Sequence, residues 1–140
     1  MLNREQIMEI IPHRAPMLLV DEITELDSEH AVGTLHLTGE EFFFQGHFPG
    51  NPLMPAVFQL EALAQTGAVA LLSIPEFKGK TAVYTGIDKA KFRAMVHPGD
   101  TIRMEIKFVK RRGLMAVAEG VVWNGAHKCA EAEIKCAVVE

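Results

Sequence analysis

The sequence is poor in cysteine: only Cys129 and Cys136 occur among its 140 residues. They lie seven positions apart in a segment that we expect to be one strand, so they point to opposite faces, about 23 Å apart at ~3.3 Å per residue. That distance excludes a disulfide between them, and two such cysteines do not make a sulfur-ligated metal site. We interpret both as structural residues.

The chain also lacks an excess of positive charge and a long run of purely apolar residues. Its 14 lysines and arginines against 18 aspartates and glutamates give a formal net charge of −4, which argues against nucleic acid or an anionic membrane as the main partner. The one long apolar stretch contains Glu61 and Gln65, whereas a membrane span needs ~20 residues with few or no charges. We find no secretory signal and expect a cytoplasmic protein.

The length and composition are those of one globular domain over residues 1–140. Hydrophobic residues make up 49% of the chain and charged residues 23%, which is ordinary for a globular protein. A chain of this length buries most of the surface that its unfolded form exposes. We therefore expect a proper core that needs no disulfide.

The central segment from Phe42 to Ser73 has two halves of opposite composition. Glycines and prolines are dense up to Pro55, which excludes regular helix or strand there. Residues 56–73 contain no proline and one glycine and are rich in alanine and leucine, so they predict a helix with Pro55 in its first turn. Because this helix is apolar on every side, we expect it to be buried in the core.

Shorter elements flank this helix. Asn3 and Gln6 have the spacing of a capping box that begins a brief helix, which Pro12 stops. Apolar patterning and turn signals predict six strands, with a bulge at Gly86 and a tight hairpin at 124–125. The predicted strands cover residues 17–26, 31–38, 81–93, 100–110, 114–123 and 127–138.

The order of these elements predicts an α+β hot-dog fold, in which an antiparallel sheet wraps around one long central helix. A sheet with one apolar face needs a cover, and only the helix at 56–73 is long and apolar enough to supply it. The helix carries more apolar surface than one sheet face requires. We therefore expect the domain to dimerise.

Glu61 is the conspicuous residue of the apolar helix. Burying an unpaired carboxylate is expensive, so the group must find partners or become neutral. Gln65 lies one turn later on the same face, where it can orient the carboxyl group, and His47 stands in the loop that leads into the helix. Taken singly, Glu61 is better explained by a distant ion pair, and His47 by a role in capping the loop. Together they favour an acid and a base that work at neutral pH.

The run GHFPGNPLMPAVFQLEALAQ, with PHRAPMLLVDEI before it and IDKAKFRAMVHPGD and FVKRRG after it, resembles the β-hydroxyacyl-acyl carrier protein dehydratases of type II fatty acid synthesis (FabZ type). The resemblance covers essentially the whole chain, and its central motif is long and specific. It implies a hot-dog fold that functions as a homodimer, often assembled further into a hexamer as a trimer of dimers. It also implies an active site in a tunnel at the dimer interface, with His47 from one subunit and Glu61 from the other.

The reaction implied by the resemblance is loss of water from a (3R)-hydroxyacyl thioester on acyl carrier protein, which gives the trans-2-enoyl product without a metal or organic cofactor. Neutral His47 would remove the proton from C2, and Glu61 would protonate the hydroxyl at C3 or hold the water that does so. The free N–H groups of Ala56 and Val57 would stabilise the enolate oxygen, helped by the helix dipole.

Further residues acquire expected roles from the same resemblance. Tyr84 falls where the family places a mobile tyrosine over the tunnel entrance, although ordinary strand packing explains it equally well. We interpret His13 and Arg14 as loop anchors rather than catalytic residues. An acidic carrier protein could dock on a basic patch, and the alternative is a strand edge protected by its charges. The patch would comprise Lys89, Lys91, Arg93, Lys107, Lys110, Arg111 and Arg112.

Two positions depart from the family pattern. Ala15 stands where an aromatic residue is usual and could widen the mouth of the site. Ala56 stands where glycine is usual, so the first turn of the helix must have regular backbone geometry. Neither change removes a chemical group, but both leave the preferred acyl chain length open.

Three other functions remain compatible with these residues. A dehydratase that also isomerises the product to the cis-3-enoyl form would use the same His47 and Glu61, although that branch usually carries Asp at the latter position. A hot-dog thioesterase is disfavoured by the spacing of the two residues. A non-catalytic acyl-binding protein would have no reason to keep a costly carboxyl group in a buried helix.

Overall fold

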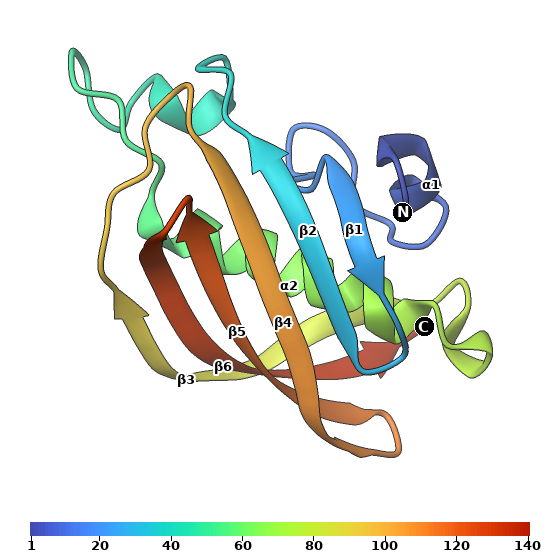
Figure 1. Cartoon of the computed structure of the whole chain (residues 1–140). Coiled ribbons are helices and arrows are strands. Elements are labelled where there is room, and N and C mark those ends of the chain that lie inside the picture. Colours follow the sequence, from blue (N-terminus) through green and yellow to red (C-terminus); the bar gives the residue numbers. More distant parts are fainter.

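The computed structural model describes residues 1–140 as one curved antiparallel sheet wrapped around one long helix, as Figure 1 shows. The six strands follow the order β1-β2-β4-β5-β6-β3, and all neighbours are antiparallel. This arrangement confirms the predicted α+β hot-dog fold. The elements are α1 (Arg4–Met8), β1 (Glu22–Leu26), β2 (His30–His36), α2 (Ala56–Leu72), β3 (Thr81–Phe92), β4 (Thr101–Arg112), β5 (Met115–Asn124) and β6 (His127–Val139).

The capping box predicted for the first helix is present. The backbone N–H of Gln6 donates to Asn3 Oδ1 at 2.9 Å, and the backbone N–H of Asn3 donates to Gln6 Oε1 at 2.8 Å. These two bonds satisfy donors that the start of a helix leaves free. They explain why so short a helix, Arg4–Met8, is formed at all.

The first strand is shorter than predicted, because it begins at Glu22 and not at residue 17. The amide of the Gln65 side chain takes up the backbone groups that would have entered the sheet. Its Nε2 donates to the carbonyl of Met17 at 2.7 Å, and its Oε1 accepts the N–H of Leu19 at 2.7 Å. A side chain on α2 therefore replaces a strand partner for this segment.

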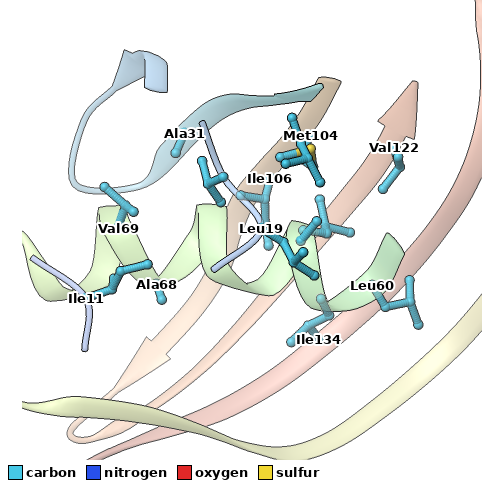
Figure 2. Close-up of a cluster of buried hydrophobic side chains, with 14 of the residues drawn as sticks. Ile11, Leu19, Ala31, Leu60, Ala68, Val69, Met104, Ile106, Val122 and Ile134 are labelled. Atoms are coloured by element: carbon cyan, nitrogen blue, oxygen red, sulfur yellow. The ribbon is translucent and has the colours of Figure 1, made fainter. Parts of the chain in front are cut away.

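The core lies between α2 and the concave face of the sheet. Figure 2 shows Leu60, Ala68 and Val69 of the helix among sheet residues such as Ile106 and Ile134. All five are at most 7% exposed, and each large apolar side chain so buried contributes about 1.5–3 kcal/mol to stability. The prediction of a buried helix is thus confirmed for most of its length.

Two glycines allow this close approach of helix and sheet. A Cβ at Gly67 on α2 would lie 2.8 Å from Ile106 Cδ1, and a Cβ at Gly120 on β5 would lie 2.7 Å from both methyl carbons of Leu63. Such distances are too short for carbon atoms, so a larger residue at either position would force the side chain of Ile106 or Leu63 to move.

One end of α2 and one edge of the sheet are not covered within a single chain. Val57 in the first turn of the helix is 65% exposed, which the prediction of a fully buried helix missed. Strand β3 pairs only with β6, and its apolar side chains Val83, Ile87 and Phe92 are 42–48% exposed. The bulge predicted at Gly86 is present, since the register shifts between it and Tyr84.

The segment before α2 is irregular, apart from one 3₁₀ turn at Phe42–Phe44 that the sequence did not predict. This turn precedes the first glycine of the segment. Both cysteines are free, and only Cys129 is fully buried, in agreement with the expected absence of a disulfide. Neither helix has the length and hydropathy that crossing a bilayer requires.

Candidate active site

The carboxyl group of Glu61 is held by two hydrogen bonds. Gln65 Nε2 donates to Oε2 at 2.8 Å, and the hydroxyl of Tyr84 donates to Oε1 at 3.1 Å. The Glu61 side chain remains 18% exposed, so it borders the site instead of being enclosed in the core. The predicted partner Gln65 therefore contacts this carboxyl group. Because Gln65 also binds the backbone of residues 17–19, it holds Oε2 of Glu61 on the side of that segment.

Tyr84 reaches Glu61 from the edge strand β3. Its hydroxyl lies 3.3 Å from the carbonyl of Leu60 as well as 3.1 Å from Glu61 Oε1. Burial, and after it the charge of Glu61, raises the pKa of Tyr84 well above its usual value. The hydroxyl therefore stays protonated and acts as a donor to Oε1 of Glu61.

His13 also lies beside Glu61, although we had interpreted it as a loop anchor. Its Nε2 is 3.8 Å from Glu61 Oε2, and its Nδ1 is buried without a hydrogen-bond partner. Burial lowers the pKa of His13, and Arg14 lowers it further, while the carboxylate of Glu61 opposes both. The ring is neutral at pH 7 as a result. No pattern in the sequence predicts this contact, because it joins residues far apart along the chain.

His47 lies in the tight loop before α2. Its Nδ1 is 3.0 Å from the carbonyl oxygen of Leu53, and its ring stacks on Phe48 with centroids 3.9 Å apart. A carbonyl oxygen can only accept, so Nδ1 carries the proton and Nε2 keeps its lone pair. The loop thus presents the basic nitrogen of His47 away from its own backbone.

Within one chain, no hydrogen bond or ion pair joins His47 to Glu61. The loop of His47 makes its contacts with residues around it, whereas Glu61 faces β3 and the loop of His13. The sharing of the site between subunits remains a prediction.

The start of α2 has the predicted free donors. The helix begins at Ala56 with regular right-handed geometry, as an alanine at that position requires, and its N-cap Pro55 makes no side-chain hydrogen bond. Neither Ala56 nor Val57 donates its backbone N–H to a carbonyl or side chain. These two groups, at the positive end of the helix dipole, can stabilise a developing negative charge.

A narrow apolar cavity lies between α2 and the sheet beside these residues. Its volume is about 50 Å³, and His13, Glu61 and Tyr84 supply most of its polar lining. A cavity needs about 10–15 Å³ measured in this way to hold one water molecule, so this one has room for only a few. The remaining lining, apart from Gln65, is apolar and includes Ala68, Leu71, Ile106, Phe108, Ile134 and Cys136.

The basic residues predicted to form one docking patch fall into separate groups. Through the paired strands, Arg111 lies level with Tyr84 near the start of β3, whereas Lys91 lies near the other end of that strand. Two strands separate β3 from β4 within one chain, and the docking patch itself remains a prediction. Lys89, Lys91 and Arg93 form one group, Lys110, Arg111 and Arg112 the other, and Lys107 lies between them along β4.

Arg93 is further set apart by an ion pair. Its guanidinium lies 3.3 Å from the carboxylate of Glu131 on the neighbouring strand. Arg111 instead lies over the ring of Phe77, 5.9 Å from its centroid. The charge of Arg93 is thus partly neutralised, and the group at the end of β4 carries the stronger free charge.

Comparison with known proteins shows which family the chain resembles. The sequence is 51% identical over 138 residues to the 3-hydroxyacyl-acyl-carrier-protein dehydratase FabZ of Clostridium novyi (strain NT), which covers 98% of this chain and 97% of the relative. It is 51% identical over 139 residues to the protein of the same name from Pelotomaculum thermopropionicum, covering 99% of each.

Among solved structures, the dehydratase heterocomplex ApeI:P from Xenorhabdus doucetiae has a similar fold. The TM-score is 0.81 at 15% sequence identity, over 96% of this chain and 91% of that one. Residues 11–133 match the model of the FabA-like domain, so the match includes the loop of His47, the helix of Glu61 and the strand of Tyr84. The fold, the motifs and these matches together place the chain in the FabA-like family.

Proposed function

We propose that this protein dehydrates (3R)-hydroxyacyl-acyl carrier protein to trans-2-enoyl-acyl carrier protein in fatty acid elongation. The names of its relatives, at half identity over nearly the full chain, support this reaction. The observation that carries the proposal is the carboxyl group of Glu61, held by Gln65 and Tyr84 beside an apolar cavity. We place this activity in the cytoplasm, as the sequence led us to expect.

The chemical step would use His47 as base and Glu61 as acid. Nε2 of His47 takes the proton from C2, and the electron pair forms the C2–C3 double bond as the C3–O bond breaks. Glu61 gives its proton to the departing hydroxyl, which leaves as water. Negative charge that builds on the thioester oxygen is stabilised by the backbone N–H groups of Ala56 and Val57.

Tyr84 would act as a gate in this reaction. Its hydroxyl occupies Oε1 of Glu61, the oxygen that must face the substrate hydroxyl. Because the cavity behind it has a volume of only about 50 Å³, the side chain would have to swing out before an acyl chain could enter. Such gating by a mobile side chain is common in enzymes that exclude water from their reactions.

The active unit would be a homodimer with a tunnel at the interface, and dimers would assemble further into hexamers. The unpaired edge of β3 and its exposed apolar residues support pairing with a second chain, since such edges are templates for strand addition. The exposed Val57 beside the catalytic loop supports the same conclusion. Pairing would also supply the His47 that each Glu61 lacks within its own chain.

The acidic carrier protein would dock on basic residues near the entrance. Lys110, Arg111 and Arg112 are the stronger candidates, because they lie level with Tyr84 in the sheet and are free of ion pairs. The group formed by Lys89, Lys91 and Arg93 lies toward the far end of β3. Electrostatic steering of this kind raises association rates and weakens with added salt.

The test is product analysis with a medium-length 3-hydroxyacyl carrier protein. Wild type is compared with Glu61→Gln and with Glu119→Gln, an exposed control on β5. We expect only trans-2-enoyl product from wild type and the control, and a rate lower by orders of magnitude for Glu61→Gln.

Other products would identify the alternative functions. A cis-3-enoyl product beside the trans-2 form would identify a dehydratase that also isomerises. Release of the free carrier thiol would identify a thioesterase. Tight binding of the acyl group without conversion would identify a non-catalytic protein and refute the proposal.

A further inference from the structure

His13 lies against Glu61, yet the mechanism proposed above gives it no task. It stands in the loop between α1 and β1, with its side chain 23% exposed and its Nε2 3.8 Å from Glu61 Oε2. Its other nitrogen, Nδ1, is buried and has no partner. Buried polar atoms are almost always hydrogen-bonded, so a ring held in this way at an active site requires an explanation.

The surroundings of the ring decide where its single proton lies. With the proton on Nδ1, a buried donor would lack an acceptor, and the lone pair of Nε2 would face the carboxyl group of Glu61. With the proton on Nε2, the N–H group points toward a carboxyl oxygen that can accept it. This tautomer of neutral His13 leaves no buried donor unpaired and puts the N–H group on the nitrogen that lies nearest to Glu61.

The loop that carries His13 is fixed by hydrogen bonds to its backbone. The guanidinium of Arg14 donates to the carbonyl of His13 at 2.7 Å, and to those of Ile11 and Met8 at 3.0 Å each. Gln65, which contacts Glu61, also binds the backbone of Met17 and Leu19 in the same loop. Glu61 and the ring of His13 are thus placed by one connected set of bonds.

We propose that His13 is a positioning residue that donates its Nε2–H to Glu61 Oε2 during turnover. The present distance of 3.8 Å is too long for a hydrogen bond. Once Tyr84 leaves Oε1, however, Glu61 retains only the donor from Gln65, and a movement of about 1 Å would bring Oε2 within bonding distance of His13. This inference rests on the proposed function, which requires Tyr84 to leave.

The bond matters most when Glu61 gives up its proton. The carboxyl group then becomes a carboxylate, and a second donor already in place stabilises that charge as it forms. An interaction that is stronger in the transition state than in the ground state raises kcat without tightening substrate binding. Loss of the donor should therefore lower kcat and leave KM little changed.

The test compares His13→Phe, which keeps a planar ring but has no donor, with His13→Gln, whose amide N–H falls near the position of Nε2. His97→Phe is the control, because the side chain of His97 is 53% exposed and lies outside the site. We expect His13→Phe to lower kcat by about 10–100-fold, in the range typical of residues that orient a catalytic group. His13→Gln should recover most of that loss, and His97→Phe should match wild type.

Two results would overturn the role of His13 while leaving the dehydratase intact: a kcat for His13→Phe equal to that of His97→Phe, or no recovery in His13→Gln. An inactive wild type would instead refute the proposed function on which this role depends. Should His13→Phe fail to fold, ¹⁵N NMR of the wild-type imidazole gives an independent answer. Protonated Nε2 supports the proposal, and protonated Nδ1 contradicts it.

Discussion

Gln65 is the residue whose loss should affect both the fold and the site. Replacing it by leucine removes the acceptor of the Leu19 N–H, the donor to the Met17 carbonyl and the donor to Glu61. Leu19 is only 2% exposed, so its unpaired N–H should cost about 1–3 kcal/mol, and the lost bond to Met17 about 0.5–1.5 kcal/mol. We therefore expect Gln65→Leu to lower the free energy of unfolding by roughly 2–4 kcal/mol.

The helix offers a matched control in Gln59. This second glutamine is 2% exposed, but its Oε1 has no partner and its Nε2 reaches the carbonyl of Ala94 at only 3.4 Å. Gln59→Leu replaces the same groups yet breaks at most one weak bond, so it should be nearly neutral. Urea unfolding of both variants, at one protein concentration because the chain is expected to dimerise, measures the difference.

A loss in Gln65→Leu no greater than that in Gln59→Leu would refute the reasoning. It would show that the hydrogen bonds of Gln65 add nothing beyond the burial of an amide. With the loss confirmed, kcat of the folded Gln65→Leu protein should also fall, because Glu61 would lose the donor that holds it in the resting structure and would keep only the donor proposed for His13 once Tyr84 moves.

Three further predictions concern packing, pH and assembly. Gly67→Ala gains about 0.5–1 kcal/mol of helix propensity but overpacks against Ile106, so we expect a net loss of about 0–2 kcal/mol. Adding Ile106→Val, which removes the clashing methyl carbon, should make the alanine more favourable in a thermal melt, whereas independent, additive effects would contradict the contact. Burial lowers the pKa of His13 in the folded protein, so the contribution of this residue to stability is complete above its unfolded pKa near 6.5 and declines as pH falls below that value. The unfolding free energy of His13→Gln should therefore change less between pH 5 and 7 than that of wild type. An unchanged slope would count against the lowered pKa. Ile87→Lys on the open edge of β3 should shift the sedimentation coefficient toward that of a monomer, whereas an unchanged value would exclude that edge as the interface.

Local signals in the sequence predicted the local structure well. The capping box at Asn3 and Gln6, the bulge at Gly86 and the long helix from Ala56 each follow from residues a few positions apart. The fold class followed because only one helix could cover the sheet. Such features depend on the helix and strand propensities of neighbouring residues and on the spacing of apolar positions, both of which can be read from a single sequence.

Contacts between distant segments could not be predicted in the same way. Residues 17–21 look like a strand by composition, but a side chain from α2 takes up their backbone groups. His13 meets Glu61 because a loop and a helix pack together, and no spacing encodes that contact. The basic residues lie close together along the sequence, whereas the strand order puts two strands between those of β3 and those of β4.

The proposed reaction requires that each site combine His47 of one subunit with Glu61 of the other. Mixing His47→Ala chains with Glu61→Gln chains tests it, after the subunits have been allowed to exchange. Under random pairing about half of the dimers are mixed, and one of the two sites in each mixed dimer is intact. We predict that two inactive proteins recover up to about a quarter of wild-type activity. No recovery, with exchange of subunits verified, would show that a shared site does not exist.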